Sequence, residues 1–246
     1  MKLVLLGTTG YHPSQRGHTA CLMLPEVGIV LDAGTAMFRV HERLCTPQLD
    51  IFLTHAHLDH VVGLTYLQNV VRDKQLERVT VHASPKALGA IQEHLLAEAL
   101  FPAQPPCEFR ALAETVPLAQ SGRLSWFRLE HPGGAVGFRL DWPDCSMAYV
   151  TDTTASAAAP YVEALRGVDL LVHECNYPDA KAELAQRWGH SATSAVAEVA
   201  RQASVGRLVL THLDPTAGEE DPLGLEAARR IFPSTTLGHD LLELEF

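Results

Sequence analysis

Residues 54 to 60 read Thr54-His55-Ala56-His57-Leu58-Asp59-His60, and this segment constrains the chain more than any other. Four side chains that can bind a metal fall within six positions, directly after a largely apolar run, 49–53, that is typical of a strand. Imidazole and carboxylate groups are costly to bury unless something binds them. Imidazole nitrogens and carboxylate oxygens are also ligands that zinc accepts. The segment therefore predicts a metal site at the end of a strand.

The size and composition indicate one large α/β domain or two small ones. The chain has 246 residues, of which 47% are hydrophobic, enough for a substantial core. Its apolar runs are too short for a transmembrane helix, so we expect no membrane span. The apolar start at Leu3–Leu6 is interrupted by Gly7, which leaves it too short for a signal peptide. We expect it to be the first strand.

Cysteine usage and charge narrow the class further. The cysteines are odd in number and form no CxxC pair, which predicts neither a disulfide framework nor a cysteine zinc site and favours a reducing cytoplasm. We expect all five to be small buried side chains: Cys21, Cys45, Cys107, Cys145 and Cys175. The net charge of −10 argues against general nucleic-acid binding, which needs clustered Lys and Arg.

Short apolar runs alternate with helical patterns along the chain, which is typical of an α/β fold. Strands are predicted over 3–6, 21–24, 28–31, 51–54, 79–82, 124–129, 135–140, 146–151, 168–172, 207–211 and 241–246. Helices are predicted over 58–70, from Pro85 to Leu96, from about Ser191 to Gln202 with Ser191 or Thr193 as the cap, and after Pro222.

One internal similarity supports a site built from two halves. Leu53-Thr54-His55 resembles Leu210-Thr211-His212, and both put a histidine just past a hydrophobic strand. Loops at strand ends are where α/β folds gather their chemistry. The similarity favours two related halves that face each other across a site, although chance similarity of two strand ends stays open.

The spacing within the cluster suits two adjacent metals. His55 and His57 lie two apart and can point to one side, whereas Asp59 and His60 begin the next helix and can point to another. Two metals need more ligands, and we expect them at other strand ends. The candidates are His131, Asp152 and His212, with the two oxygens of Asp152 suited to a bridging position.

The other histidines divide into three groups. His190 precedes a predicted helix, whose first turn has backbone N–H groups that attract a phosphate, and Glu174 is a candidate partner that orients it. An exposed residue at a helix start is the alternative for His190. We interpret His12, His41, His82 and His94 as surface or hydrogen-bonded core residues. The roles of His18, His173 and His239 stay open.

The order of these motifs resembles the metallo-β-lactamase fold of hydrolases, and within it the ribonuclease Z group and its small phosphodiesterase relatives. The resemblance runs from Leu5-Leu6-Gly7-Thr8 and Leu31-Asp32-Ala33-Gly34-Thr35 through the cluster to the last strand. It also rests on His131 followed by Gly137-Phe138, on Thr151-Asp152-Thr153, on His173-Glu174 followed by Gly189-His190-Ser191, and on Leu210-Thr211-His212.

The resemblance implies an α/β fold of a single domain over 1–246, a four-layer αββα sandwich with two zinc ions at one edge. Mn²⁺ or another divalent ion is an alternative in one site. It implies that His55, His57 and His131 hold one ion, that Asp59, His60 and His212 hold the other, and that Asp152 bridges them. It further implies that His190 lies at the scissile phosphate, supported by Glu174, as a general acid or only as a phosphate contact, and that Asp59 shuttles a proton.

One departure bears on the substrate. Ribonuclease Z enzymes that mature tRNA carry a long Gly/Pro-rich insertion, but here only Asp141–Cys145 joins the two corresponding strands. The loop after His212 is acidic, with Glu219, Glu220 and Asp221. Both features argue against a large nucleic acid and favour a small, cyclic nucleotide-type phosphodiester.

The sequence thus leads to the hypothesis of a dizinc phosphodiesterase. Three alternatives stay open: tRNA 3′ processing with the clamp supplied by a partner subunit, a thioesterase, lactonase or β-lactamase on the same scaffold, and a non-catalytic metal-binding sensor. The relatives often form dimers, so a homodimer is also open.

Overall fold

The computed structural model describes residues 1–218 and 221–246. Glu219 and Glu220, part of the acidic loop noted above, lie outside the described residues. The chain divides into two compact units, one of residues 1–113 with 240–245 and the other of residues 114–239 with Phe246. Each unit has its own seven-stranded sheet, and the two are described separately below. The prediction of a single domain over 1–246 stays a prediction.

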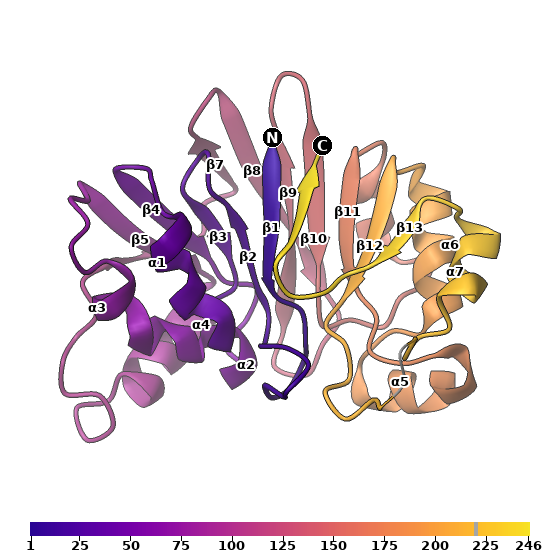
Figure 1. Ribbon diagram of the computed structural model, residues 1–246, viewed down its shortest axis with the longest axis horizontal. Coiled ribbons are helices and arrows are strands. Elements are labelled where there is room, and N and C mark those ends of the chain that lie inside the picture. Colours follow the sequence, from indigo (N-terminus) through magenta and orange to yellow (C-terminus); the bar gives the residue numbers. More distant parts are fainter. Residues whose placement is uncertain (219–220) are drawn as a thin grey trace. The chain divides into compact units, whose positions relative to one another are not determined.

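The first unit is built on a mixed sheet with the strand order β14-β1-β2-β3-β4-β5-β6 (Figure 1). The strands from β3 to β6 are parallel, whereas β14, β1, β2 and β3 pair antiparallel. The strand bounds are Lys2–Gly7 (β1), Cys21–Leu24 (β2), Ile29–Leu31 (β3), Gln48–Phe52 (β4), Arg78–Ala83 (β5), Glu108–Ala111 (β6) and Leu242–Glu245 (β14). The carboxyl ends of the parallel strands meet at one edge, so the loops that follow β3 and β4 are neighbours.

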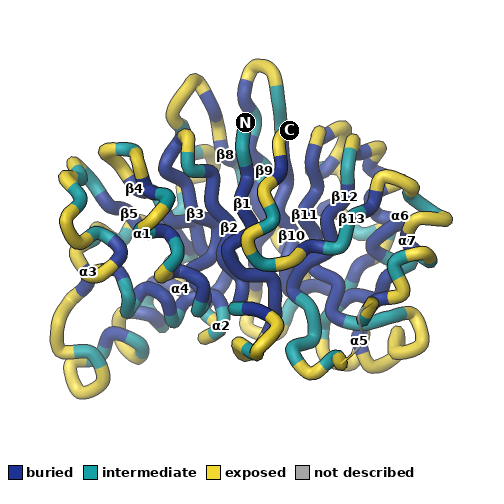
Figure 2. Tube along the Cα trace, viewed as in Figure 1, coloured by how far each residue is buried: buried dark blue, intermediate teal, exposed yellow. Residues whose placement is uncertain are grey.

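Short helices pack on this sheet and form its core. They are η1 (Thr35–Arg39), α1 (Val40–Arg43), α2 (Leu58–Val61), η2 (Val62–Tyr66), α3 (Leu67–Val70), α4 (Pro85–Ala90) and η3 (Ile91–Leu95). Met37 and Leu67 belong to the same buried cluster as Val30 and Ile51 of the strands. Each such side chain contributes about 1.5–3 kcal/mol when fully buried, so this packing holds the helices on the sheet. Figure 2 shows the strands largely buried and the loops exposed.

The helix predicted over 58–70 is broken into α2, the 3₁₀ helix η2 and α3. The cause is a close backbone approach at Gly63. Its N–H donates to the carbonyl of Ala33 at 2.7 Å instead of continuing the helix, and a Cβ there would lie 2.3 Å from the carbonyl oxygen of Gly34. The segment is thereby held against the loop after β3, and so are Asp59 and His60 of α2, the predicted metal ligands.

The second unit is built on a mixed sheet with the order β13-β12-β11-β10-β9-β8-β7. The strands β7 to β10 are antiparallel and β10 to β13 are parallel. Their bounds are Thr115–Leu118 (β7), Gly122–Leu129 (β8), Ala135–Asp141 (β9), Ser146–Val150 (β10), Leu170–Glu174 (β11), Arg207–Thr211 (β12) and Thr235–Leu237 (β13). The connection between β9 and β10 is residues 142–145, one residue shorter than predicted, because Asp141 pairs with Ser146 inside the sheet.

The helices of the second unit are η4 (Pro160–Leu165), η5 (Asp179–Lys181), α5 (Ala182–Trp188), α6 (Thr193–Ala203) and α7 (Leu225–Ile231). Val196, Val199 and Ala200 of α6 are fully buried and join one cluster with Leu171 and Leu208 of the sheet. Figure 1 shows α6 and α7 side by side next to β12 and β13, in agreement with their contacts. Among the described residues, no helix is long and apolar enough to cross a membrane.

Most predicted strands are confirmed, with shifts at their ends. The strand predicted over 51–54 ends at Phe52, and the one predicted over 168–172 runs from Leu170 to Glu174. Three strands were missed, β6, β7 and β13. In β6 and β7, which have four residues each, every residue is exposed or half-buried, so neither has the continuous apolar run by which most of the other strands were predicted.

The prediction that all cysteines are small buried side chains is wrong for three of them. Cys21 and Cys175 are buried, but Cys45 is exposed, and Cys107 and Cys145 are half-buried. All five are free thiols, as the absence of CxxC pairs predicted. Burial raises the pKa of Cys107 to about 12, so its thiol stays protonated at neutral pH.

Candidate functional site

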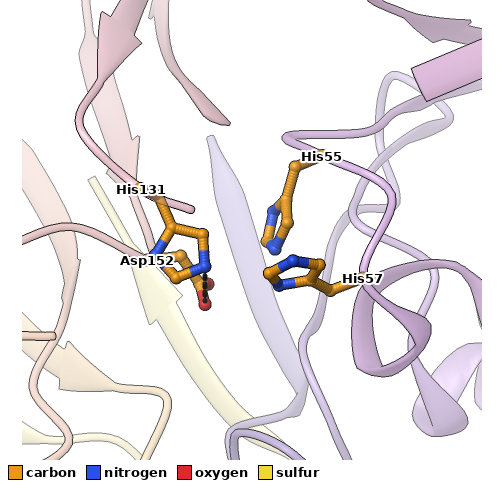
Figure 3. A group of neighbouring side chains, drawn as sticks. All are labelled: His55, His57, His131 and Asp152. Atoms are coloured by element: carbon orange, nitrogen blue, oxygen red, sulfur yellow. Dashed lines mark ion pairs between the residues drawn. The ribbon is translucent and has the colours of Figure 1, made fainter. Parts of the chain in front are cut away.

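In the first unit, the predicted cluster lies directly after β4. His55 and His57 belong to the loop that follows the strand, and Asp59 and His60 belong to α2. The ring of His55 lies 4.4 Å from that of His57 and 4.3 Å from that of His60, measured between centroids. Figure 3 shows the side chains of His55 and His57 on this loop, with their imidazole rings next to each other. The local chain therefore brings three imidazoles together.

Asp32 orients the cluster from the loop after β3. Its Oδ2 lies 2.8 Å from Nδ1 of His60, and both side chains are fully buried. The carboxylate also accepts hydrogen bonds from the backbone N–H and the hydroxyl of Thr54. Asp32 has a left-handed backbone with φ of +58°, which is rare for residues other than glycine and points to a constrained position. Because Nδ1 of His60 donates to Asp32, its Nε2 is the atom left for a metal.

Thr54 sets the tautomer of His55 in the same way. The single hydroxyl proton of Thr54 is donated to Asp32, so the hydroxyl oxygen must accept from Nδ1 of His55, which lies 3.0 Å away. The Nε2 of His55 is then unprotonated and suited to bind a metal. Asp32 thus organises two imidazoles, one directly and one through Thr54.

Asp59 lies at the edge of the cluster. Its Oδ2 is 3.4 Å from Nε2 of His60 and accepts a hydrogen bond from the backbone N–H of Tyr11 at 2.8 Å. Its side chain is 12% exposed, compared with none for His60, and His57 is exposed as well, so solvent reaches both His57 and Asp59. The carboxylate is therefore placed to act either as a ligand or as a proton acceptor.

In the second unit, three predicted ligands lie together, with Asp152 between two histidines. His131 follows β8, Asp152 follows β10, and His212 follows β12. The Nε2 of His131 lies 3.5 Å from Oδ1 of Asp152, an ion pair that Figure 3 marks with a dashed line. The Nε2 of His212 lies 3.4 Å from Oδ2 of the same carboxylate. Asp152 thus presents one oxygen to each histidine, which is the arrangement that a bridging carboxylate requires.

The supporting contacts of these three side chains come from distant parts of the chain. The Nδ1 of His131 lies 3.3 Å from the carbonyl oxygen of Gly189, so it donates and leaves Nε2 for a metal. The amide of Asn176 donates to the carbonyl of His212 at 2.8 Å. Asp152 and His212 have left-handed backbones, with φ of +51° and +57°. Strain of this kind persists only where the surrounding structure holds it.

His190 lies next to this group. Its Nδ1 is 3.4 Å from Oε1 of Glu174, which lies at the end of β11 and is fully buried. One ligand atom each from Asp152, His190 and His212 lies within 4.8 Å of the others. The Oε1 of Glu174 also accepts from the N–H of Thr153, while its Oε2 is buried without a hydrogen-bond partner among the described residues. A buried carboxylate of this kind stabilises positive charge on the adjacent imidazole.

One expectation about His190 is wrong in its local detail. The helix begins at Thr193 and its N-cap is Ala192, without a side-chain cap, so neither Ser191 nor Thr193 has the predicted role. The N–H of Ser194 in the first turn already donates to Asp179 at 2.8 Å. An acidic side chain from another segment therefore occupies the helix start, where the sequence suggested a phosphate. The hydroxyl of Ser191 instead donates to the carbonyl of Thr153.

The remaining histidines follow the prediction where it was made. His12 and His94 are exposed, and His41 is half-buried, with Nδ1 3.0 Å from the carbonyl of Val70. His82 is a buried residue with Nε2 3.0 Å from Asp50. His173 was left open, and it is fully buried between the carbonyl of Glu174 and the hydroxyl of Tyr161. Burial lowers the pKa of His173, which keeps it neutral.

Comparison with known families supports the fold. The sequence profile described as the β-lactamase superfamily domain matches residues 28–213. A solved metallo-β-lactamase fold protein, YhfI from Bacillus subtilis, superposes with a TM-score of 0.82 at 19% identity, covering 99% of each chain. A diphosphatase of the PhnP family gives a TM-score of 0.76 at 19% identity, covering all of this chain and 96% of the other. The metallo-β-lactamase fold expected from the sequence is confirmed.

Curated relatives with higher identity match only part of the chain. Ribonuclease Z of Synechococcus sp. (strain CC9605) is 40% identical over 107 residues, which is 42% of this chain and 33% of that protein. Ribonuclease Z of Parasynechococcus marenigrum (strain WH8102) is 41% identical over the same length. The match therefore spans about a third of the length of these relatives.

Proposed function

Because the chain belongs to the β-lactamase superfamily, we propose that it is a metal-dependent hydrolase with two divalent ions that cleaves small phosphodiesters. The observation that carries the proposal is the buried Glu174 beside His190, next to a carboxylate, Asp152, that faces two histidines. A site that only bound metal would need Asp152 and the histidines it faces, but not Glu174. The Glu174–His190 pair adds a proton donor, which an alkoxide leaving group requires.

The donor set fits divalent ions of the zinc type. His55, His60 and His131 each have Nδ1 engaged by an oxygen acceptor, so each offers Nε2. We propose that His55, His57 and His131 hold one ion, that Asp59, His60 and His212 hold the other, and that Asp152 bridges them. Zinc suits this mixture of imidazole and carboxylate, and Mn²⁺ or another divalent ion is the alternative in one of the two sites. This assignment combines candidate ligands of the first unit with candidate ligands of the second. The family relationship, rather than any one contact, supports that combination.

A pair of divalent ions supplies a water nucleophile at neutral pH and neutralises charge on a phosphate. The remaining tasks belong to the chain's own residues. Glu174 holds the imidazole of His190 and stabilises its protonated form, so that His190 can give a proton to the departing alkoxide oxygen. Asp59, which solvent reaches, accepts the proton that the nucleophile releases. Asp32 and Thr54 keep the imidazoles in one tautomer throughout.

Three observations favour a small substrate. The connection between β9 and β10 has only four residues, so it cannot form the clamp that tRNA-processing relatives carry there. The net charge of −10 disfavours a large polyanion. A solved protein of the PhnP family that shares the fold is described as a diphosphatase, not as a nuclease.

Processing of tRNA 3′ ends is the second candidate, because the relatives with 40% identity are named ribonuclease Z. It would require a partner subunit to supply the clamp. Size-exclusion chromatography with light scattering shows whether the chain forms a homodimer, and incubation with precursor tRNA tests the activity. Cleavage at the 3′ end would replace the small-substrate proposal.

The decisive experiment is a substrate panel on protein stripped with a chelator and reloaded with Zn²⁺ or Mn²⁺. Bis-p-nitrophenyl phosphate, a thioester and a lactone are compared at equal metal loading. The proposal expects turnover of the diester and little of the acyl substrates, and loss of turnover without metal. Preference for an acyl substrate would assign a thioesterase or lactonase, and metal binding without any turnover would favour the sensor.

The five free thiols, one of them exposed, support a reducing compartment such as the cytoplasm.

A further inference from the structure

A pocket of about 500 Å³ lies in the second unit, beside two of the predicted ligands. Its wall includes Glu130, which precedes His131, and Thr153, which follows Asp152. The hydroxyl of Thr153 donates to the carbonyl of Glu130 at 3.3 Å, so the two loops that carry the ligands are tied together at the pocket. Two residues of the pocket wall are thus the chain neighbours of His131 and Asp152, which places the pocket beside these two predicted ligands.

The composition of the wall suits a ring-bearing organic group. Small-molecule sites of about 300–1,000 Å³ are mostly apolar with a few placed polar groups. This pocket combines apolar residues with hydroxyls and one cation, chief among them Arg128, Leu129, Thr153, Ala159, Pro160 and Tyr161. A methyl or glycerol substituent would leave most of the volume empty, whereas a nucleoside would occupy much more of it.

Tyr161 gives the pocket a rigid aromatic wall. Its hydroxyl lies 3.1 Å from Nε2 of His173, and Nδ1 of that histidine donates to the carbonyl of Glu174 at 2.7 Å. The hydroxyl of Tyr161 must therefore be the donor to Nε2. The ring of Phe127 lies nearly parallel to that of Tyr161, at 10° and 6.2 Å between centroids. The wall is thus held in place before any ligand arrives, which reduces the entropy cost of binding a flat ring.

Arg128 and Glu130 supply side chains that have no polar partner within the described part of the chain. Both side chains are exposed at the pocket, and neither has an ion pair or a side-chain hydrogen bond among residues 1–218 and 221–246. A guanidinium donates in a planar fork, whereas a carboxylate only accepts. Together they match a flat heterocycle whose edge carries both acceptors and donors.

From these observations we infer that this pocket, called the 128–161 pocket, binds the nucleoside portion of the substrate, with Arg128 and Glu130 contacting the edge of the base. The inference rests on the proposed function and specifies its substrate class as nucleoside phosphodiesters rather than alkyl ones. Arg128 is in this view a specificity-determining residue that takes no part in bond cleavage.

The test uses two esters with the same leaving group. Thymidine 5′-monophosphate p-nitrophenyl ester and methyl p-nitrophenyl phosphate both release p-nitrophenol and differ only in the retained group. The metal-loaded wild-type protein should have a kcat/KM ratio, nucleoside over methyl ester, of about ten or more. Ala158→Trp, which narrows the pocket from an exposed position, and Arg128→Gln should each lower that ratio about tenfold, mainly through KM. Arg123→Gln, an exposed arginine at the other end of β8, should leave the ratio unchanged.

A binding measurement separates this inference from the proposed function. Calorimetry with the nucleoside ester and metal-free protein should show binding to the wild type and weaker binding to Ala158→Trp. If neither ester is hydrolysed but the nucleoside ester binds in this way, the proposed function fails and the pocket assignment stands. If both esters are hydrolysed at similar kcat/KM, and the pocket variants resemble Arg123→Gln, the pocket assignment is overturned and the hydrolase stands.

Discussion

The Nδ1 atom of His60 lies 2.8 Å from Oδ2 of Asp32, and neither side chain is exposed to solvent. A second histidine–aspartate pair lies in the sheet of the same unit, with Nε2 of His82 3.0 Å from Oδ1 of Asp50, which is partly exposed and also binds Arg78. Of these two pairs, only the first belongs to the candidate metal-binding cluster. The second pair can therefore serve as a control for substitutions in the first.

Replacing Asp32 with Asn should lower metal affinity about 10–100-fold, as expected when the group that orients a ligand is changed. The proton donated by Nδ1 of His60 would lose its charged acceptor, and the tautomer with Nε2 unprotonated would be less favoured. Competition titration with a chromogenic chelator measures the affinity. Asp50→Asn is the matched control and should leave it unchanged, so equal losses in both variants would indicate a general structural effect.

Replacing Asp152 with Ala should reduce the bound metal to fewer than two ions per chain, because both carboxylate oxygens face histidine ligands. Metal content after dialysis gives the stoichiometry. A ligand that binds only the folded state stabilises it by about 2.7 kcal/mol at one hundred times its dissociation constant. The addition of Zn²⁺ should therefore raise the melting temperature of the wild type more than that of the variant. Asp141→Ala, in the same sheet, should behave as the wild type.

Replacing His190 with Ala should slow diester cleavage by about 10²–10⁴-fold if His190 protonates the leaving group. The metal content should not change, which distinguishes this role from ligation, since His190 also lies within ligand range of Asp152 and His212. Esters with better leaving groups need less protonation, so the loss should shrink from an alkyl to a p-nitrophenyl leaving group. Loss of one ion in the variant would instead make His190 a ligand.

Replacing Asp240 with Ala should lower the free energy of unfolding by about 3 kcal/mol, the range for breaking a buried ion pair. Its carboxylate accepts from the N–H and hydroxyl of Thr8, from the N–H of His18, and from Arg39 at 2.5 Å. Urea denaturation gives the value. Glu243, whose ion pair with Lys2 is solvent-exposed, is the control, and its replacement with Gln should lower the free energy of unfolding far less than Asp240→Ala does.

The contribution of Asp50 to the free energy of unfolding should be present at neutral pH and lost in acid. Burial alone would raise the pKa of Asp50, but the hydrogen bonds from His82 and Arg78 outweigh it, and the net pKa is lowered. A carboxyl whose folded pKa lies below its unfolded value stabilises the protein above the unfolded pKa, near 3.9, and loses that contribution as the pH falls through the folded pKa. Asp50→Asn should therefore be less stable than the wild type at pH 7, and the difference should shrink below about pH 4. A constant difference in urea denaturation from pH 7 to pH 3 would contradict this explanation.

Much of the candidate site was predictable because its residues stand at strand ends. His55, Asp152 and His212 each follow a parallel strand within a few residues, and such strands carry apolar runs that the sequence shows directly. The ligand roles themselves stay predictions until metal binding is measured. Asp32 was missed as a site residue although its segment, Leu31–Thr35, was part of the resemblance, because a single carboxylate in a loop gives no periodic signal.

The sequence by itself determined the family, the identity of the candidate ligands and the predicted strand that each of them follows. These features depend on residue type and local spacing. Only the tertiary structure decided how those side chains are held. His60 is oriented by Asp32, 28 residues away, and His131 by the carbonyl of Gly189, 58 residues away. It also decided that Gly63 breaks the predicted helix and that Asp179 covers the start of α6. These outcomes depend on hydrogen bonds between groups far apart along the chain, and local sequence patterns carry no record of such partners.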